Sequence, residues 1–145
     1  MTFQSGDESY AIPIHFVNEI IGLQKITEVP ETANYIKGLI NLRGKIIPVI
    51  DVRLRFGKEP LEYNDRTCVI VITVNKVVVG LIVDTIADVV NIAEENIVPP
   101  PHMVNNNGAQ RFVYGIGKIG DEVKLLIDPA NLISDEEQEL LESLH

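Results

Sequence analysis

Short runs of apolar residues, most of them β-branched, recur along the chain and are separated by turn-forming residues. Isoleucine and valine together make up 37 of the 145 residues, and such side chains pack well on the pleated surface of a strand. The pattern predicts a mainly β fold. We expect strands over residues 10–14, 45–52, 67–74, 77–84, 87–92, 112–118 and 122–127.

Turn-forming residues predict how these strands are connected. Asn75 and Lys76 stand alone between two apolar runs, which is typical of a tight hairpin. Glycines punctuate the other runs, as expected for the bends of a small barrel. Only the C-terminal end has helical periodicity, because a capping box at Ser134 and Glu137 precedes leucines with helical spacing. We expect a short C-terminal helix.

A weak internal repeat relates the two halves of the chain. Its offset is 69 residues at first and becomes 77 after an insertion within residues 100–108. The aligned positions include Ile12 with Leu81, Val17 with Ile86, Glu19 with Asp88, Val29-Pro30 with Val98-Pro99, Gly38 with Gly115, Ile50 with Ile127 and Asp51 with Asp128. Each unit is too small to bury enough surface alone. We therefore expect units at residues 1–65 and 66–145, packed as one domain with a groove between them and with strand exchange left open.

Composition excludes some classes of function. The formal net charge is −9 and the pI is about 4.7, without a basic cluster to neutralise phosphates, so nucleic-acid binding is not expected. Cys68 is the only cysteine, which excludes a disulfide within the chain and suits a reducing compartment. Charged residues interrupt the apolar runs and no secretion signal is visible. We expect a cytoplasmic protein that does not insert into a membrane.

Residues that could support catalysis or metal binding lack the necessary spacing. The three histidines are far apart, and the sequence contains neither a zinc motif nor a nucleophile elbow. Residues 115–120 match a dinucleotide-binding glycine pattern, but another strand follows them, so we interpret them as a hairpin. Asp51 and Asp128 end matching strands, which indicates a shared turn rather than a catalytic pair. We expect no catalytic residue, no metal and no cofactor.

One arginine stands out as a candidate for recognition. Gly38 and Gly44 bracket Arg43, and an apolar strand follows. Glycine permits tightly turned backbone, so the bracket places Arg43 on a short connection between strands. Its guanidinium offers five fixed donors and a permanent charge, which suits binding to a carboxylate of another protein. The alternative is a surface arginine that merely follows a turn.

A series of short motifs covers residues 8 to 133. They are Tyr10-Ala-Ile-Pro-Ile14, Val17-Asn-Glu-Ile20, Ile36-Lys-Gly38, Asn41-Leu-Arg-Gly44, Pro48-Val-Ile-Asp51, Arg55-Phe-Gly57, Val79-Gly-Leu-Ile-Val-Asp84, Asp88-Val89, Gly115-Ile-Gly117 and Leu125-Leu-Ile-Asp128. In this order they resemble the CheW family of chemotaxis coupling proteins. The most specific element is the pattern Asn-Leu-Arg-Gly-x-x-x-Pro-x-x-Asp.

The resemblance implies an all-β fold of two packed, five-stranded SH3-like barrels. It implies a non-catalytic adaptor that couples transmembrane chemoreceptors to the histidine kinase CheA, recruited to receptor arrays at the inner face of the cell membrane. The receptor's helical hairpin tip would dock in the groove between the barrels, and the regulatory domain of the kinase would pair with the first barrel. Self-association of copies within arrays is also left open.

The family's functional positions can be carried over by motif. The resemblance makes Arg43 and Glu19 receptor-docking residues, and it associates three apolar positions with the same groove: Val17, Cys68 and Val89. It also assigns a supporting role in the docking turn to Lys37, Gly38, Asn41, Leu42 and Gly44. Cys68 departs from the usual valine or isoleucine, although a cysteine has a similar size. The N-terminal strand is also expected to be short, since only residues 1–4 precede the first turn.

Two alternatives stay open at this point. The first is a regulatory CheW-like domain belonging to a CheA kinase, which would share the fold and many of these motifs. The second is a small ligand-binding or hydrolytic barrel that uses Asp51 or Asp128 in the groove, for which the sequence offers no partner residue.

Overall fold

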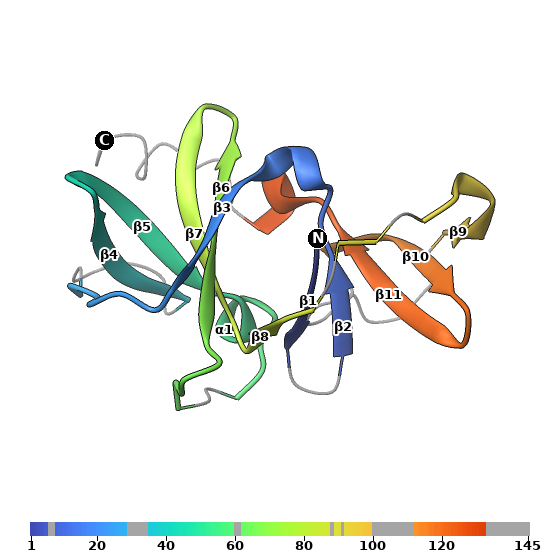
Figure 1. Cartoon of the computed structure of the whole chain (residues 1–145), viewed down its shortest axis with the longest axis horizontal. Coiled ribbons are helices and arrows are strands. Elements are labelled where there is room, and N and C mark those ends of the chain that lie inside the picture. The colour runs from blue at the N-terminus through green and yellow to red at the C-terminus, as the bar shows by residue number, and fades with distance from the viewer. Residues whose placement is uncertain are drawn as a thin grey trace.

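The computed structural model describes residues 1–5, 8–28, 35–59, 62–87, 89–90, 92–99 and 112–132. The expected C-terminal helix lies outside these residues. Strands dominate the described part and form two sheets (Figure 1), as the apolar pattern predicted.

The five-stranded sheet has the strand order β3-β6-β7-β5-β4. Its members, in chain order, are β3 (Val17–Gly22), β4 (Ile36–Leu42), β5 (Lys45–Asp51), β6 (Cys68–Val74) and β7 (Val77–Val83). The hairpin between β6 and β7 turns at Asn75 and Lys76, both with positive φ, which confirms the predicted tight turn.

The six-stranded sheet has the strand order β8-β1-β2-β11-β10-β9. Its members are β1 (Thr2–Ser5), β2 (Glu8–Ala11), β8 (Thr85–Ile86), β9 (Ile97–Val98), β10 (Val113–Ile119) and β11 (Glu122–Ile127). Short helices connect the strands: η1 (Ile14–Phe16), α1 (Val52–Arg55), η2 (Glu94–Asn96) and η4 (Pro129–Leu132). The first strand is short, as expected, yet β1 pairs with β2 on one side and β8 on the other.

Several predicted strands differ from the observed ones. β3, β4, β8 and β9 were not predicted: polar residues such as Asn18 and Glu19 interrupt the apolar pattern of β3, and β8 and β9 have only two residues each. The strand predicted over 10–14 is instead β2 at Glu8–Ala11, and residue 14 begins η1. In contrast, no described residue within 87–92 belongs to a strand. The chain instead pairs just before this segment, where β8 reaches β1. Residues 115–120 lie in β10 and its turn into β11, which confirms the hairpin interpretation.

The two halves of the chain do not coincide with the two sheets. β6 and β7 follow residue 65 but pair with strands that precede it, and β2 in the first half pairs with β11 in the second. The β5–β7 and β2–β11 pairs are both parallel. Parallel neighbours need long crossover connections, so strands from distant segments must interleave. A division at residue 65 therefore cuts through the five-stranded sheet.

The two faces of the five-stranded sheet contribute to different cores. Along β6, Ile70 and Ile72 belong to the larger core, whereas Val69 and Val71 belong to the smaller one. Successive side chains of a strand point to opposite faces, so both faces of this sheet are covered. Burial on both faces explains why β6 and β7 read as nearly continuous apolar runs. The larger core also includes residues of the six-stranded sheet and joins the two sheets.

A backbone bridge closes the five-stranded sheet into a barrel. β3 and β4 are its two edge strands, and the chain that follows β3 crosses to β4. There Thr27 and Leu39 exchange two backbone hydrogen bonds of 2.8 Å each. The smaller core fills the inside of this barrel with Ile40, Ile47 and Val49 among its members.

Candidate docking surface

The Asn-Leu-Arg-Gly motif forms the hairpin turn between β4 and β5. Arg43 and Gly44 are the two loop residues, with φ of 51° and 89°. Positive φ at both positions matches the right-handed twist of the flanking strands. The Asn41 side-chain oxygen accepts a 2.9 Å hydrogen bond from the backbone N–H of Gly44 and braces the turn. Positive φ carries a steric cost for a residue other than glycine. The turn nevertheless holds Arg43 in this conformation, with its side chain exposed.

Arg43 and Glu19 form an ion pair between the β4–β5 turn and β3. The Arg43 Nη2 donates to Glu19 Oε2, and the two side chains are 68% and 34% exposed. Glu19 comes from β3 and Arg43 from the β4–β5 turn, which are the two edges of the sheet. The sequence assigned both residues to docking but did not predict that they touch. An ion pair this exposed contributes about 0–1 kcal/mol to stability, so a partner can compete for either charge.

A shallow pocket of about 320 Å³ surrounds this ion pair. Its lining includes Leu42 from the same turn and Lys45 from the start of β5. The remaining lining residues are Asn18, Glu19, Arg43, Ile47, Val71 and Val78. Apolar walls with two cations and one carboxylate at the rim favour contact with another protein's side chains.

The structure places Val17 and Cys68 on the same face of the β3–β6 pair. Val17 is opposite Ile72 and Cys68 is opposite Gly22, and both pack against the larger core while staying partly exposed. Ile20 of β3 pairs with Ile70 of β6, between the Val17–Ile72 and Gly22–Cys68 pairs, and is 39% exposed. We call Val17, Ile20 and Cys68 the apolar strip. Ile20 was not predicted as a site residue, because its alternation with Glu19 along β3 would suggest that it faces the core rather than solvent.

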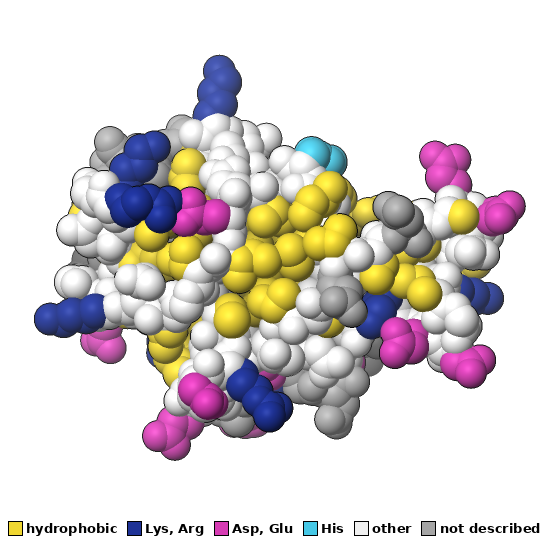
Figure 2. All heavy atoms as spheres, in the orientation of Figure 1, with side chains coloured by type: hydrophobic (Ala, Val, Ile, Leu, Met, Phe, Trp, Pro, Cys, Tyr) yellow, Lys and Arg dark blue, Asp and Glu magenta, His cyan; other side chains and the backbone are white. Residues whose placement is uncertain are grey.

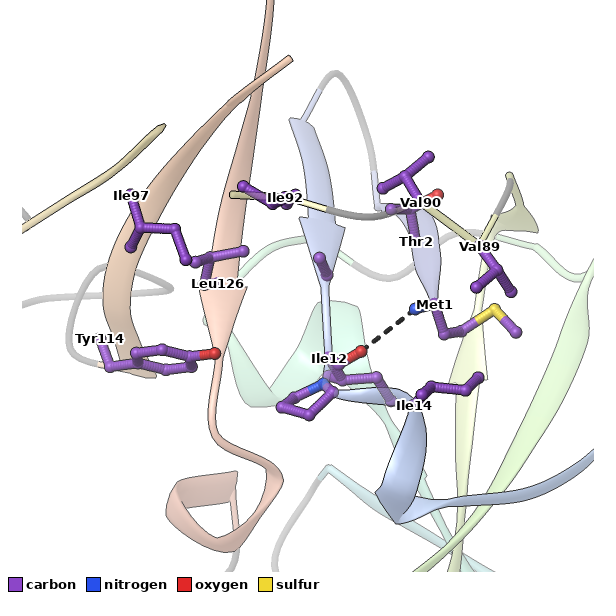
Figure 3. A pocket seen from close by; sticks show the side chains of 12 residues that line it. Met1, Thr2, Ile12, Ile14, Val89, Val90, Ile92, Ile97, Tyr114 and Leu126 are labelled. Atoms are coloured by element: carbon purple, nitrogen blue, oxygen red, sulfur yellow. Dashed lines mark hydrogen bonds between the residues drawn. The ribbon is translucent and has the colours of Figure 1, made fainter. Parts of the chain in front are cut away.

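Val89 lies away from Arg43, at a second pocket of about 220 Å³ that we call the apolar pocket. Figure 3 shows its walls, which come from the N-terminal strands, the segment before η2 and the β10–β11 hairpin. Val89, Ile14 and Tyr114 at this pocket are 60%, 52% and 49% exposed. They are three of the six large hydrophobic residues that are exposed in the described part of the chain. Ile14 and Tyr114 were not predicted as site residues.

Val17 and Cys68 of the apolar strip pack against the larger core, which joins the two sheets. Figure 2 shows apolar side chains gathered in the middle of the face in view, with basic and acidic side chains around the outside. Burial raises the pKa of the Tyr114 phenol, and the nearby Asp128 carboxylate adds to the increase. Tyr114 therefore stays neutral in the physiological pH range. We call the ion pair, the apolar strip and the apolar pocket together the docking surface.

Lys37 and Gly38 lie near the start of β4, several residues before the Arg43 turn. Gly38 lies beside Thr27 at the bridge that closes the barrel, with φ of 148°. The Lys37 ammonium lies 6.0 Å from the centre of the Tyr63 ring, at the outer limit of a cation–π contact. The supporting role assigned to Lys37 and Gly38 stays a prediction.

Asp51 and Asp128 act as caps of short helices. Asp51 Oδ1 accepts hydrogen bonds from the backbone N–H groups of Arg53 at 2.9 Å and Leu54 at 3.4 Å. Its Oδ2 accepts a 2.7 Å hydrogen bond from the Tyr63 hydroxyl. Asp128 Oδ1 accepts a 3.0 Å hydrogen bond from the N–H of Ala130. The shared-turn interpretation is confirmed, because each aspartate starts a turn directly after a matching strand.

The described residues contain neither a metal-ligand cluster nor a membrane-spanning helix. Within them, no group of three histidine, cysteine, aspartate or glutamate side chains could hold a metal ion. No helix in that part of the chain is long and apolar enough to span a membrane.

Comparison with known proteins agrees with this architecture. A sequence model of the CheW-like domain matches residues 1–137. The chain is 36% identical over 144 residues to the chemotaxis protein CheW of Klebsiella aerogenes, covering 99% of this chain and 86% of that relative. It is 37% identical over 125 residues to the Helicobacter pylori chemotaxis protein CheW, covering 86% of this chain and 74% of that one. The crystal structure of the scaffolding protein TtCheW from Thermoanaerobacter tengcongensis superposes with a TM-score of 0.86 at 36% identity, covering 97% of this chain and 94% of that chain.

Proposed function

Because this chain belongs to the CheW-like family, we propose that it is a chemotaxis adaptor that couples transmembrane chemoreceptors to the histidine kinase CheA. The observation that carries the proposal is the docking surface, which places an exposed ion pair next to exposed apolar side chains. In this proposal the protein works in the cytoplasm, within receptor arrays at the inner face of the cell membrane.

The receptor partner is the helical hairpin at the cytoplasmic tip of the chemoreceptor. An amphipathic helix binds a groove through its apolar face, so the apolar strip and Val89 supply most of the affinity. Arg43 sets the register and orientation of the hairpin by binding a carboxylate in exchange for Glu19. The Arg43 guanidinium can exchange one carboxylate for another because it is exposed rather than buried in the core.

The kinase partner is the regulatory domain of CheA, which pairs with the barrel that contains β3, β4 and β5. The contact of this kinase domain leaves the junction between the two sheets free for the receptor. Both partners can then bind at the same time, as coupling requires.

The coupling role needs no catalysis. The buried Asp51, which is 3% exposed, already has hydrogen-bond partners on both carboxylate oxygens. A general acid or base must instead reach a substrate through its own hydrogen bond. This use of Asp51 disfavours the hydrolytic alternative.

Titration of the protein with two separate partners tests the proposal. The partners are a receptor hairpin-tip fragment and a CheA regulatory domain, each measured by calorimetry against the native chain and Arg43→Ala. We expect the native chain to bind both, and Arg43→Ala to lose about 1–3 kcal/mol of binding to the receptor fragment when the charge is desolvated in the complex. Its melting temperature should stay nearly unchanged, because the ion pair is exposed.

Lys118→Ala is the matched control, since it removes an exposed cation from β10, outside the docking surface. It should bind both partners like the native chain. A folded native chain that binds neither partner would overturn the adaptor function. An Arg43→Ala chain that unfolds would show that the arginine is structural and that its assignment to the site is wrong.

A further inference from the structure

Three cations directly after β5 reach across to the six-stranded sheet and its connections. They are Arg53 and Arg55 in α1 and Lys58 in the turn that follows, within the segment 53–58. Figure 1 shows α1 at the junction of the two sheets. The three side chains end on three different elements, and the docking function described above uses none of them.

Arg55 joins α1 to both ends of the C-terminal hairpin. Its Nε donates a 2.6 Å hydrogen bond to the backbone carbonyl of Leu132, the last residue of η4. Its guanidinium carbon lies 4.8 Å from the ring centre of Phe112, directly before β10, and 4.3 Å from that of Tyr35, directly before β4. A planar guanidinium stacks on such rings in a way that an ammonium cannot. One side chain therefore connects elements of both sheets.

Lys58 and Arg53 make the other two connections. The Lys58 ammonium donates to the Ser5 carbonyl at 2.8 Å and to the Tyr10 hydroxyl at 3.1 Å, which ties it to β1 and β2. Arg53 binds Asp84 at 2.8 Å, at the point where β7 continues into β8. Each contact has a charged donor, so it is stronger and more directional than a neutral hydrogen bond.

Charged contacts add a directional restraint to the apolar packing between the sheets. Phe56 in the same segment packs on Tyr10 and Phe112, with ring centres 4.8 and 5.7 Å away. Burial of such rings holds the sheets together, but the hydrophobic effect is not directional. Three charged contacts at separate points do restrict rotation of one sheet against the other.

We propose that segment 53–58 is an orientation latch, which holds the six-stranded sheet at a fixed angle to the five-stranded sheet and so aligns the two parts of the docking surface. One part, with Arg43 and the apolar strip, belongs to the five-stranded sheet. The other part is the apolar pocket, whose walls belong mostly to the six-stranded sheet and the segments next to it. Arg55 is the central positioning residue, because among the three cations it contacts η4 and the residues directly before β4 and β10.

The latch has a selective consequence, which rests on the proposed function. A receptor hairpin that spans both parts of the docking surface binds with full affinity only when the two parts are aligned. A kinase domain that contacts only the five-stranded barrel does not depend on that alignment. Loosening the latch therefore weakens one interaction and spares the other.

The first experiment measures the angle between the sheets as a distance. With Cys68→Ser as background, spin labels are placed on Lys76→Cys in the β6–β7 turn and Asp121→Cys in the β10–β11 turn, both exposed. We expect one narrow distance distribution by pulsed electron resonance, and a broadened or shifted one in Arg55→Met. Lys118→Met, the control, should match the native distribution. An unchanged distribution in Arg55→Met overturns the latch.

The second experiment measures binding with the native Cys68 in place. At a temperature where Arg55→Met is fully folded, its affinity for the receptor fragment should fall about three- to tenfold, and its affinity for the kinase domain should stay the same. Arg55→Lys keeps the charge but loses the planar stacking, so it should fall between Arg55→Met and the native chain. Equal losses for both partners would indicate a purely structural arginine and overturn the proposal.

The two experiments separate the latch from the adaptor function. If the native chain binds neither partner, the adaptor function fails, and the distance distribution still decides whether the latch exists. If the native chain binds both partners and Arg55→Met binds each of them as tightly as the native chain does, the adaptor function stands and the latch fails.

Discussion

Gly38 lies so close to Thr27 that no larger residue fits between them: a Cβ atom at Gly38 would be 2.1 Å from the Thr27 carbonyl oxygen. The contact occurs where Thr27 and Leu39 exchange the backbone hydrogen bonds that close the five-stranded barrel. The glycine that the sequence associated with the Arg43 turn is thus required for barrel closure.

Gly38→Ala should therefore destabilise the protein. The added methyl group collides with backbone that cannot move without breaking the Thr27–Leu39 bridge, and φ of 148° strains any side chain. We expect a loss of about 1–3 kcal/mol in the free energy of unfolding, measured by urea denaturation. Gly22→Ala is the control, because a Cβ atom there meets nothing within 4 Å. Equal stability losses in the two variants would contradict the role of Gly38 in closure.

Tyr63→Phe should destabilise the protein through Asp51. The variant removes the 2.7 Å hydrogen bond to Oδ2 of a carboxylate that is only 3% exposed. A buried acceptor without its donor costs about 1–3 kcal/mol, which urea denaturation resolves. Tyr114→Phe removes a hydroxyl from a half-exposed ring and should change the free energy of unfolding by less than about 0.5 kcal/mol. A similar effect of both variants would show that Tyr63 does not support Asp51.

Tyr10 and Tyr63 make the stability of the fold depend on alkaline pH. Burial raises the pKa of Tyr10 and of Tyr63 above the usual 10.0, and each phenol's hydrogen bond to a carboxylate, Glu8 or Asp51, adds to the increase. In the unfolded chain both phenols ionise near pH 10, whereas the folded protein keeps their protons at higher pH. The stabilisation is thus fully present below about pH 10 and is lost as pH rises toward the folded pKa values.

This dependence is measurable as the free energy of unfolding in urea from about pH 8 to about pH 11. We expect a decrease that begins near pH 10, and a shallower decrease in Tyr63→Phe because the Tyr63 phenol no longer contributes. If the native chain and Tyr63→Phe lose stability with the same slope, Tyr63 does not contribute to the alkaline transition.

The local features of the chain were predictable from residue order alone. The turn at Asn75 and Lys76, the hairpin at residues 115–120 and the caps at Asp51 and Asp128 follow from rules that act over a few neighbouring residues. The all-β class follows from apolar runs buried on both faces of a sheet. The turn at Arg43 was also predictable, since it is a short hairpin loop stabilised locally by the hydrogen bond from the Gly44 N–H to the Asn41 side chain.

The long-range relationships depend instead on how distant segments pack. The parallel β5–β7 and β2–β11 pairs mix the two halves of the chain, because a shared apolar core favours whichever strands best cover it rather than those nearest in sequence. For the same reason residues 24 positions apart meet in the Glu19–Arg43 pair, while Val89 lies at a different pocket. Short-range chemistry thus set the turns and the most apolar strands of this protein, and burial of the shared apolar cores set the strand partners and the surface they present.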